Sequence, residues 1–271
     1  MFRLARAAGV LVVVLWSAAP IAFAVLSSFK DNREIFVFPP TFVFVPTLEH
    51  YGDLFRQWPD FAGTLFNSLA VALGATLLAS SCSLLAGYVY ARHRGRGLAA
   101  SAHFMVAIRL LPPIVVTLPL FPLADWLGLN DTYAILILLY AAFFVSLGTM
   151  ILKATIDGIP GELDEAALID GAAIWQVVWH VILPLAAGGL TAAAAFVMIY
   201  AWNDYLFAFV FTTSRAKTAP LILSEMMSSL TGVNWGVLFA AVTIQLMPVL
   251  AFVWVVQRWL VAGLTAGAVK G

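Results

Sequence analysis

The sequence predicts an all-α membrane protein with six transmembrane helices. Of its 271 residues, 63% are hydrophobic and only 10% are charged, which leaves too little polar surface to cover a globule in water. The apolar residues form long runs, and a spanning helix needs roughly 20 such residues. The runs do not alternate between apolar and polar residues, as the strands of a membrane barrel would.

The expected helices follow the runs that lack Asp, Glu, Lys and Arg, apart from Arg109 in the third run. A helix satisfies its backbone hydrogen bonds within itself, which the bilayer core requires. We expect the chain, residues 1–271, to form a single transmembrane domain. The approximate helices are 7–29, 63–91, 98–123, 132–153, 183–208 and 236–258.

The first apolar run allows two interpretations. Arg3 and Arg6 precede it, and Ala22-Phe23-Ala24 could be the cleavage site of a signal peptide. The apolar run continues to Phe29, however, and is long enough to span a bilayer. The length favours an uncleaved anchor over the signal peptide.

The basic residues near the expected helix ends predict the orientation of the chain. Positive charge marks cytoplasmic loops, and six spans with both termini inside place three basic groups on that side. These groups precede the first helix, separate the second from the third, and follow the sixth: Arg3 and Arg6; Arg92, Arg94 and Arg96; Arg258 and Lys270.

The loop expected between the fourth and fifth helices, 157–180, is long for a simple connection. Its five acidic residues all lie between Asp157 and Asp170. Asp157 can cap a short helix, and Pro160 suits its first turn. The carboxylates that follow lie where the helix macrodipole favours anions. Gly171 marks the end of this short helix, and a second helical run leads to the fifth span.

Ala166 and Ala167 leave the short helix with little side-chain bulk. Its backbone could therefore press closely into a partner. The alternative is an amphipathic connector that lies on the bilayer. Interfacial helices favour Lys, Arg and bulky apolar residues, and the acidic helix departs from that composition. Residue chemistry alone leaves both interpretations open.

The spacing in this loop resembles the EAA loop of ABC importer permeases. Glu165-Ala166-Ala167 is followed by Gly171 and then by Val181-Ile182-Leu183-Pro184, in which Val181 replaces the usual isoleucine. Other segments resemble the carbohydrate branch of the family, of the maltose-transporter smaller-permease type. These segments are Ser28-Phe29-Lys30, Arg109-Leu110-Leu111-Pro112-Pro113, Ala201-Trp202-Asn203-Asp204-Tyr205-Leu206 and the tail 257–271. The resemblance covers nearly the whole chain.

The resemblance implies the type I ABC importer permease fold, with a cytoplasmic coupling helix between helices 4 and 5 that docks on a separate ATPase. It implies these coupling residues: Glu165, Ala166, Ala167, Asp170 and Gly171. It also implies that these tail residues contact the ATPase: Leu264, Thr265, Gly267 and Lys270. The chain itself would be non-catalytic and hold no cofactor, because ATP and Mg would be bound by the partner ATPase.

The implied assembly contains a second permease subunit, two copies of an ATP-binding subunit and an extracytoplasmic solute-binding protein. It would lie in the lipid of a bacterial or archaeal plasma membrane, with both termini of this multi-pass chain in the cytoplasm. The implied cargo is a di- or oligosaccharide, or a related polyol or glycerol phosphate. The net charge of zero shows no nucleic-acid footprint.

Missing motifs agree with a transporter subunit. The sequence contains no G-x-x-x-x-G-K-[ST] phosphate loop and no H-E-x-x-H pair. Its four histidines are scattered, and its single cysteine, Cys82, cannot form an intrachain disulfide. These absences argue against ATP binding by the chain itself and against a metal site.

The alternative function is an ion-coupled secondary transporter or channel subunit. Such a protein needs buried ionisable groups or broken helices near the bilayer midplane. Arg109 and the pair Pro112-Pro113 are the candidates. Arg109 could instead snorkel, or pair with carbonyls left free near the prolines.

Polar and aromatic residues in the later spans are candidates for the substrate pathway. Asn203 and Asp204 could bond a sugar hydroxyl or cap a helix, and Trp202 and Tyr205 could stack on a sugar ring or mark the interface. Gln245 could line the route or join helices. With Arg109 the candidate set is Trp202, Asn203, Asp204, Tyr205, Gln245 and Arg109.

Overall fold

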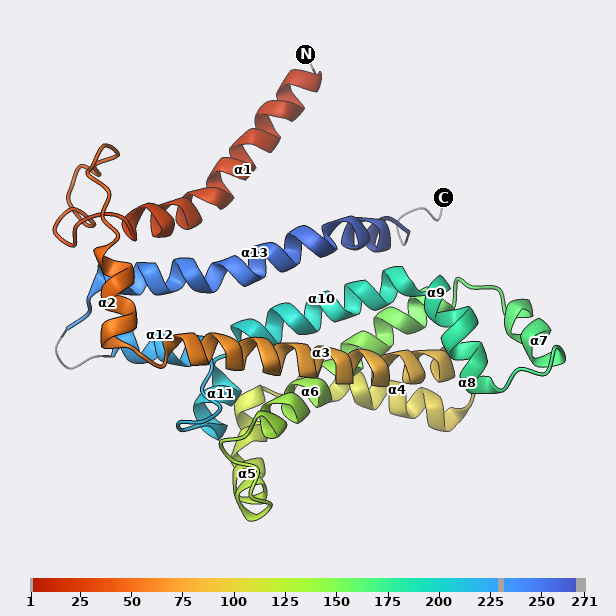
Figure 1. Ribbon diagram of the computed structural model, residues 1–271. Coiled ribbons are helices and arrows are strands. Elements are labelled where there is room, and N and C mark those ends of the chain that lie inside the picture. The colour runs from red at the N-terminus through yellow and green to blue at the C-terminus, as the bar shows by residue number, and fades with distance from the viewer. Residues whose placement is uncertain (1, 229–231, 267–271) are drawn as a thin grey trace. The chain divides into compact units, whose positions relative to one another are not determined.

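The computed structural model describes residues 2–228 and 232–266, and these residues form helices without strands (Figure 1). Within these described residues, four helices are long and apolar enough to cross a bilayer, and two bent pairs raise the number to six if each pair is one span. The single helices are α1 (Phe2–Ser27), α3 (Phe61–Arg92), α6 (Tyr133–Ile156) and α13 (Trp235–Ala266). The predicted all-α membrane fold is confirmed.

The first bent pair replaces the single helix expected at 98–123. α4 (Arg96–Ile108) and α5 (Pro113–Trp126) meet at an angle of 98°. Pro113 has no backbone N–H, and a residue that precedes a proline disfavours the helical conformation. Pro112, before Pro113, is accordingly extended, with ψ 133°. The two prolines therefore end α4 and start α5 in a new direction.

The second bent pair occupies the region expected as one helix at 183–208. The shorter arm contains α8 (Ile174–Gln176), the π-helical turn η1 (Val177–Ile182) and α9 (Leu183–Leu185). It meets α10 (Ala187–Asn203) at 83°. Asp204 is extended, so α10 ends before it, and α11 (Leu206–Phe211) begins separately.

Three further helices complete the described residues. They are α2 (Glu49–Gln57), α7 (Glu162–Ile169) and α12 (Ala219–Met227). The chain divides into two compact units, one with Met1–Leu65 and Leu221–Leu250, the other with Phe66–Pro220 and Ala251–Gly271. The candidate coupling loop lies within the second unit.

The first unit has its own apolar core. Leu54 and Phe61 are fully buried and pack with residues of α12 and the start of α13, including Met226 and Leu238. The buried His50 holds this core to the loop before α2, because its Nε2 lies 2.7 Å from the backbone oxygen of Lys30.

In the second unit, α3 and α6 approach each other closely at Gly87, and α10 packs along α6 (Figure 1). Gly87 of α3 allows the approach, because a Cβ there would lie 2.9 Å from Cβ of Leu152 and 3.1 Å from the backbone nitrogen of Lys153. Leu152 is fully buried. Small residues at helix crossings permit such backbone contact in membranes.

At the other end of this unit, Asp131 anchors the segment between α11 and α12. Asp131 adopts a left-handed conformation, with φ 58°. Its carboxylate accepts backbone N–H bonds from four consecutive residues, Thr213, Ser214, Arg215 and Ala216, at 3.0–3.1 Å. Burial by itself raises the pKa of Asp131, but the backbone N–H donors, those of Arg215 and Ala216 first, outweigh it and hold the pKa well below its usual range.

We expect Gly87→Ala to lower the stability of the protein by about 1–3 kcal/mol, because the added methyl group overpacks the α3–α6 contact. Gly188→Ala in α10 is the control, since nothing lies within 4 Å of its Cβ position. At Gly188 the substitution should be neutral or slightly stabilising, because Ala favours the helical conformation more than Gly does and has room there. The midpoint of thermal unfolding in detergent measures both. Equal midpoints for the two variants would contradict the close contact.

We expect Asp131→Asn to increase amide exchange in residues 213–216 at neutral pH. The folded pKa is depressed, so the stabilisation exists above the unfolded value of about 4 and disappears as the pH falls through the lower folded pKa. The ratio of exchange rates between variant and wild type should therefore stay constant from pH 7 to about pH 4 and shrink only below it. Mass spectrometry measures the ratio, and Asp125→Asn is the control, because among the described residues the Asp125 side chain accepts only from Asn130.

Candidate functional site

The loop predicted to couple this chain to an ATPase folds as a short helix, a sharp turn and a bent second helix. The first of these, α7, begins at Glu162, and the N–H groups of Asp164 and Glu165 bond to the carbonyl of Gly161. The expected cap by Asp157 is wrong. Asp157 follows the last residue of α6 instead, and Lys153 binds its carboxylate at 2.6 Å.

The turn after α7 has the geometry expected from Gly171. This residue has φ 88°, in the left-handed region that favours glycine. The N–H of Gly171 bonds to the carbonyl of Leu168, and the N–H of Ala172 bonds to that of Ala167, both at 3.0 Å. This pair of bonds is the Schellman motif. It reverses the chain, and η1 then packs back against α7.

An apolar core lies beneath the loop. Leu84 of α3, Leu152 and Ile156 of α6, and Val177 and Ile182 of η1 are all buried together. Ala167 and Ala172 pack against this cluster from above. This core packs the loop against the ends of the spanning helices α3 and α6, so α7 has a fixed position relative to them.

The outer face of the loop carries most of the predicted coupling residues. Glu165, Ala166, Asp170 and Gly171 are exposed, whereas Ala167 is half-buried on the core side. Large apolar side chains are exposed beside them, including Ile169, which is 85% exposed. The face offered to a partner is therefore acidic at Glu165, small at Ala166 and apolar at the end of α7.

One acidic residue of the loop has a role that the sequence did not reveal. Asp164 is buried, and Arg92, the last residue of α3, donates from Nε to its Oδ2 at 2.7 Å and from Nη2 to its Oδ1 at 3.4 Å. Arg92 also donates from Nη1 to the carbonyl of Ile156 at 3.2 Å. The sequence signals were a basic residue at the end of one span and an aspartate one helical turn before the half-buried Ala167.

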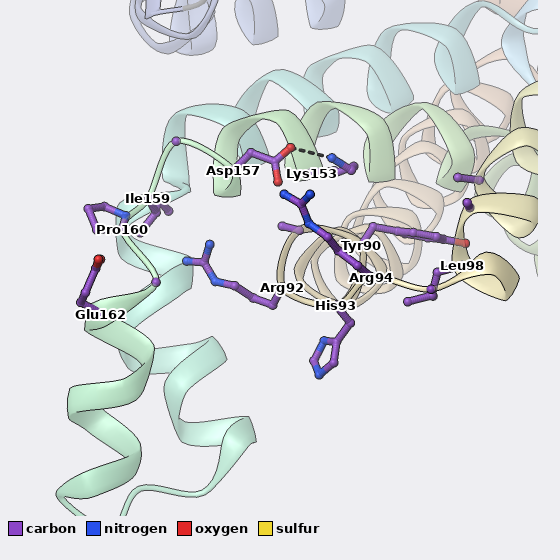
Figure 2. Close-up of a pocket in the computed structure, with 16 residues that line it drawn as sticks. Tyr90, Arg92, His93, Arg94, Leu98, Lys153, Asp157, Ile159, Pro160 and Glu162 are labelled. Carbon is purple, nitrogen blue, oxygen red and sulfur yellow. Dashed lines mark hydrogen bonds and ion pairs between the residues drawn. The ribbon is translucent and has the colours of Figure 1, made fainter.

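A cleft of about 1090 Å³ opens beside this ion pair, between the α3–α4 turn and the segment from Lys153 to Glu162. Figure 2 shows the guanidinium of Arg92 directed toward the start of α7, while that of Arg94 is directed toward Asp157. The cleft thus lies between the end of α3 and the segment that joins α6 to α7. Its lining includes basic side chains, among them Arg94, and acidic ones, among them Asp157.

Four of the predicted pathway residues, 202–205, are consecutive in the sequence but have different surroundings. Asp204 is partly buried; its Oδ2 accepts from Tyr140 Oη at 2.9 Å and from the backbone N–H of Phe207 at 2.9 Å. It therefore caps α11 and joins it to α6. Asn203 is exposed and donates to the carbonyl of Ile199, one turn back in α10.

The two aromatic candidates also diverge. Trp202 is 2% exposed, and its Nε1 has no hydrogen-bond partner within the described residues. Tyr205 is 38% exposed and stacks on Phe209, with ring centroids 5.2 Å apart. Of the two, only Tyr205 presents an open ring.

Arg109 lies at the break between α4 and α5, and its guanidinium is 6.0 Å from the ring centroid of Phe143. Phe143 in turn contacts Phe207, at 6.2 Å between centroids. Arg109 therefore lies beside Phe143, and Asp204 bonds to the backbone of Phe207, at either side of the contact between these two aromatic residues. Gln245 belongs to the first unit, where its Oε1 is buried without a partner among the residues that the structure describes.

The predicted tail contacts cannot be placed. Leu264 and Thr265 fall within α13, at positions whose side chains are not described. Gly267 and Lys270 lie outside the described residues. The role of the tail stays a prediction.

Comparison with known proteins gives the class of this chain. Residues 79–265 match the family described as binding-protein-dependent transport system inner membrane component. This match spans α6, the loop with α7, and α10. The chain belongs to that family of ABC transporter permeases and is a multi-pass membrane protein.

Two relatives cover nearly the full length. The chain is 36% identical over 263 residues to the trehalose transport system permease protein SugB of Mycobacterium tuberculosis, with 96% of this chain and 93% of the relative covered. It is 32% identical over 265 residues to the trehalose/maltose transport system permease protein MalG of Thermococcus litoralis, with 97% and 95% covered.

A solved structure supports the fold. A chain of a bacterial ABC transporter involved in the import of the acidic polysaccharide alginate matches with a TM-score of 0.79 and 19% identity, covering 96% of each chain. Because the match extends over both compact units, it supports the predicted permease fold along the length of the chain.

Proposed function

We propose that this chain is the transmembrane permease subunit of an ATP-driven importer that moves a sugar delivered by an extracytoplasmic binding protein. The observation that carries the proposal is α7, a helix that buries one face on a core formed by η1 and the ends of α3 and α6 and leaves Glu165 and Ala166 exposed. A helix fixed in this way can transmit a displacement to the helices beneath it. Its small exposed residue, Ala166, allows the backbone of a partner to approach closely.

The assembly that fits this surface has four further chains. A second permease completes the pore, two copies of an ATP-binding subunit receive the coupling helices, and the binding protein docks outside. ATP and Mg bind to the ATPase and not to this chain, which lacks a phosphate loop. The chain is a non-catalytic subunit that converts ATP-driven closure of its partner into movement of the pore.

The cargo class rests on the relatives. Two of them are named for trehalose or maltose transport, and a third is a diacetylchitobiose uptake system permease protein from Streptomyces coelicolor. We infer a di- or oligosaccharide, or a related polyol. The membrane would be the plasma membrane of a bacterium or archaeon, with both termini and α7 on the cytoplasmic side; the three basic groups near the helix ends support this orientation.

A pull-down in mild detergent through a tag on this chain, followed by mass identification, tests the assembly. We expect an ATP-binding subunit and a second permease to be recovered with it. Recovery of this chain alone, together with sugar uptake that follows an ion gradient, would contradict the importer and favour a secondary transporter.

We expect Glu165→Lys to leave membrane insertion intact but to lower sugar uptake by about tenfold or more, because it reverses the charge at the docking surface. Uptake of labelled trehalose by whole cells measures the effect. Glu49→Lys is the control, since Glu49 is exposed on α2, outside the coupling loop. Equal uptake by the two variants would show that Glu165 does not take part in docking.

A further inference from the structure

The guanidinium of Arg92 joins three helix ends. It belongs to the last residue of α3, it pairs with Asp164 in the first turn of α7, and it donates to Ile156, the last residue of α6. A guanidinium has five donors in a rigid planar fork, so it can hold several acceptors in one geometry. The arrangement ties the coupling helix directly to two spanning helices.

Burial makes this connection persistent. The side chains of Arg92 and Asp164 are only 16% and 8% exposed. A buried charge that loses its partner is strongly destabilising, so α7 cannot move away from the end of α3 without separating the two charges. Movement of α7 on an ATPase should therefore carry Arg92 with it.

The other charges of the loop make no such connection in the described part of the chain. Lys153 and Asp157 form an ion pair one turn apart at the end of α6, and their side chains are 38% and 43% exposed. Glu165 and Asp170 are exposed on the outer face. Asp164 is thus the loop carboxylate that bonds to another helix.

The helices held by Arg92 lead toward the pathway candidates. Gly87, five residues before Arg92, keeps α3 and α6 in close contact. α6 continues to Tyr140, whose hydroxyl donates to Asp204 at the break between α10 and α11. Closely packed helices move as bodies rather than deforming continuously. A displacement at the inner end of α6 would therefore reach that break.

We propose that the Arg92–Asp164 ion pair is the positioning link through which movement of α7 is transmitted to α3 and α6. The inference rests on the proposed function, since it takes α7 as the helix that docks on an ATPase. Neither residue touches substrate or nucleotide in this scheme. Their role is to keep the docking helix and the spans moving together.

The test compares Asp164→Asn with Asp157→Asn in the assembly purified with its partner subunits and reconstituted in proteoliposomes. Both substitutions remove one loop carboxylate that is paired with a base, but the Asp157 pair lies within one helix end. Labelled trehalose with the binding protein is the probe, and the readout is the amount of sugar transported per ATP hydrolysed. Sugar transport and ATP hydrolysis both scale with the amount of folded assembly, so their ratio reports coupling and not the yield of folded protein.

A second readout reports the link without relying on transport. Spin labels at Val89 of α3 and Leu168 of α7, both exposed, are placed in a Cys82→Ser background, since Cys82 is an exposed free cysteine. The width of the distance distribution between the labels measures how firmly α7 is held on α3. Asp164→Asn should broaden it, and Asp157→Asn should not.

We expect Asp164→Asn to lower the ratio of sugar to ATP by about tenfold, the size of effect seen when a coupling element is disturbed. Asp164→Glu, which keeps the charge, should retain most of the ratio. If Asp164→Asn is not recovered as an assembly, Arg92→Lys takes its place, because lysine keeps the charge but loses the fork. It should give an intermediate ratio.

An unchanged ratio with an unchanged distance distribution in Asp164→Asn, or in Arg92→Lys where that variant replaces it, would overturn the link. Failure of the proposed function gives a different result. In that case the wild-type preparation lacks an ATPase, and the spin-label distances alone decide whether the ion pair holds α7 on α3.

Discussion

A bilayer offers no partner for a free backbone N–H or C=O, so each spanning helix must satisfy its own groups. This constraint determines where polar side chains can be useful in the chain. They gather where helices end or break: Asp204 receives the free N–H of Phe207 at the start of α11, and Arg92 donates to the carbonyl of Ile156 at the end of α6. Asp204 and Arg92 therefore satisfy backbone groups at helix ends and also connect helices to one another.

Helix α6 connects the two regions of interest in the second unit. Its last residue is bonded to Arg92, and Tyr140, two turns from its start, is bonded to Asp204. Its packing along α10, and against α3 through Gly87, leaves little room for the helix to bend between these points. The loop with α7 and the break after α10 are thus both attached to α6, which suits the proposed transmission of movement along that helix.

The sequence predicted most of the architecture, because long apolar runs and glycine positions are local signals. The spanning segments, the short helix before Gly171 and the turn itself could all be recognised in this way. Two kinds of feature could not. Local patterns do not give the bends within two of the six expected spans, 98° between α4 and α5 and 83° at the start of α10, although Pro112 and Pro113 mark the first break.

The partner of Asp164 is the second kind of feature. Asp164 lies 72 residues from Arg92 in the chain, and periodicity says nothing about which distant charge a carboxylate will meet. The same limit applies to Asn203 and Asp204, which are adjacent and chemically similar. Only their placement showed that Asp204 joins two helices while Asn203 bonds within its own.

The origin of the ion pair in two distant parts of the chain affects how interchangeable the loop is. Residues 157–180 look like a self-contained cassette that could be exchanged between related permeases to change the ATPase they recruit. Yet the cassette includes Asp164 and leaves Arg92 behind on α3. A chimaera built at the loop boundaries would bury a carboxylate opposite whatever the host carries at that position. The functional module is discontinuous, and its true boundary includes the last turn of α3.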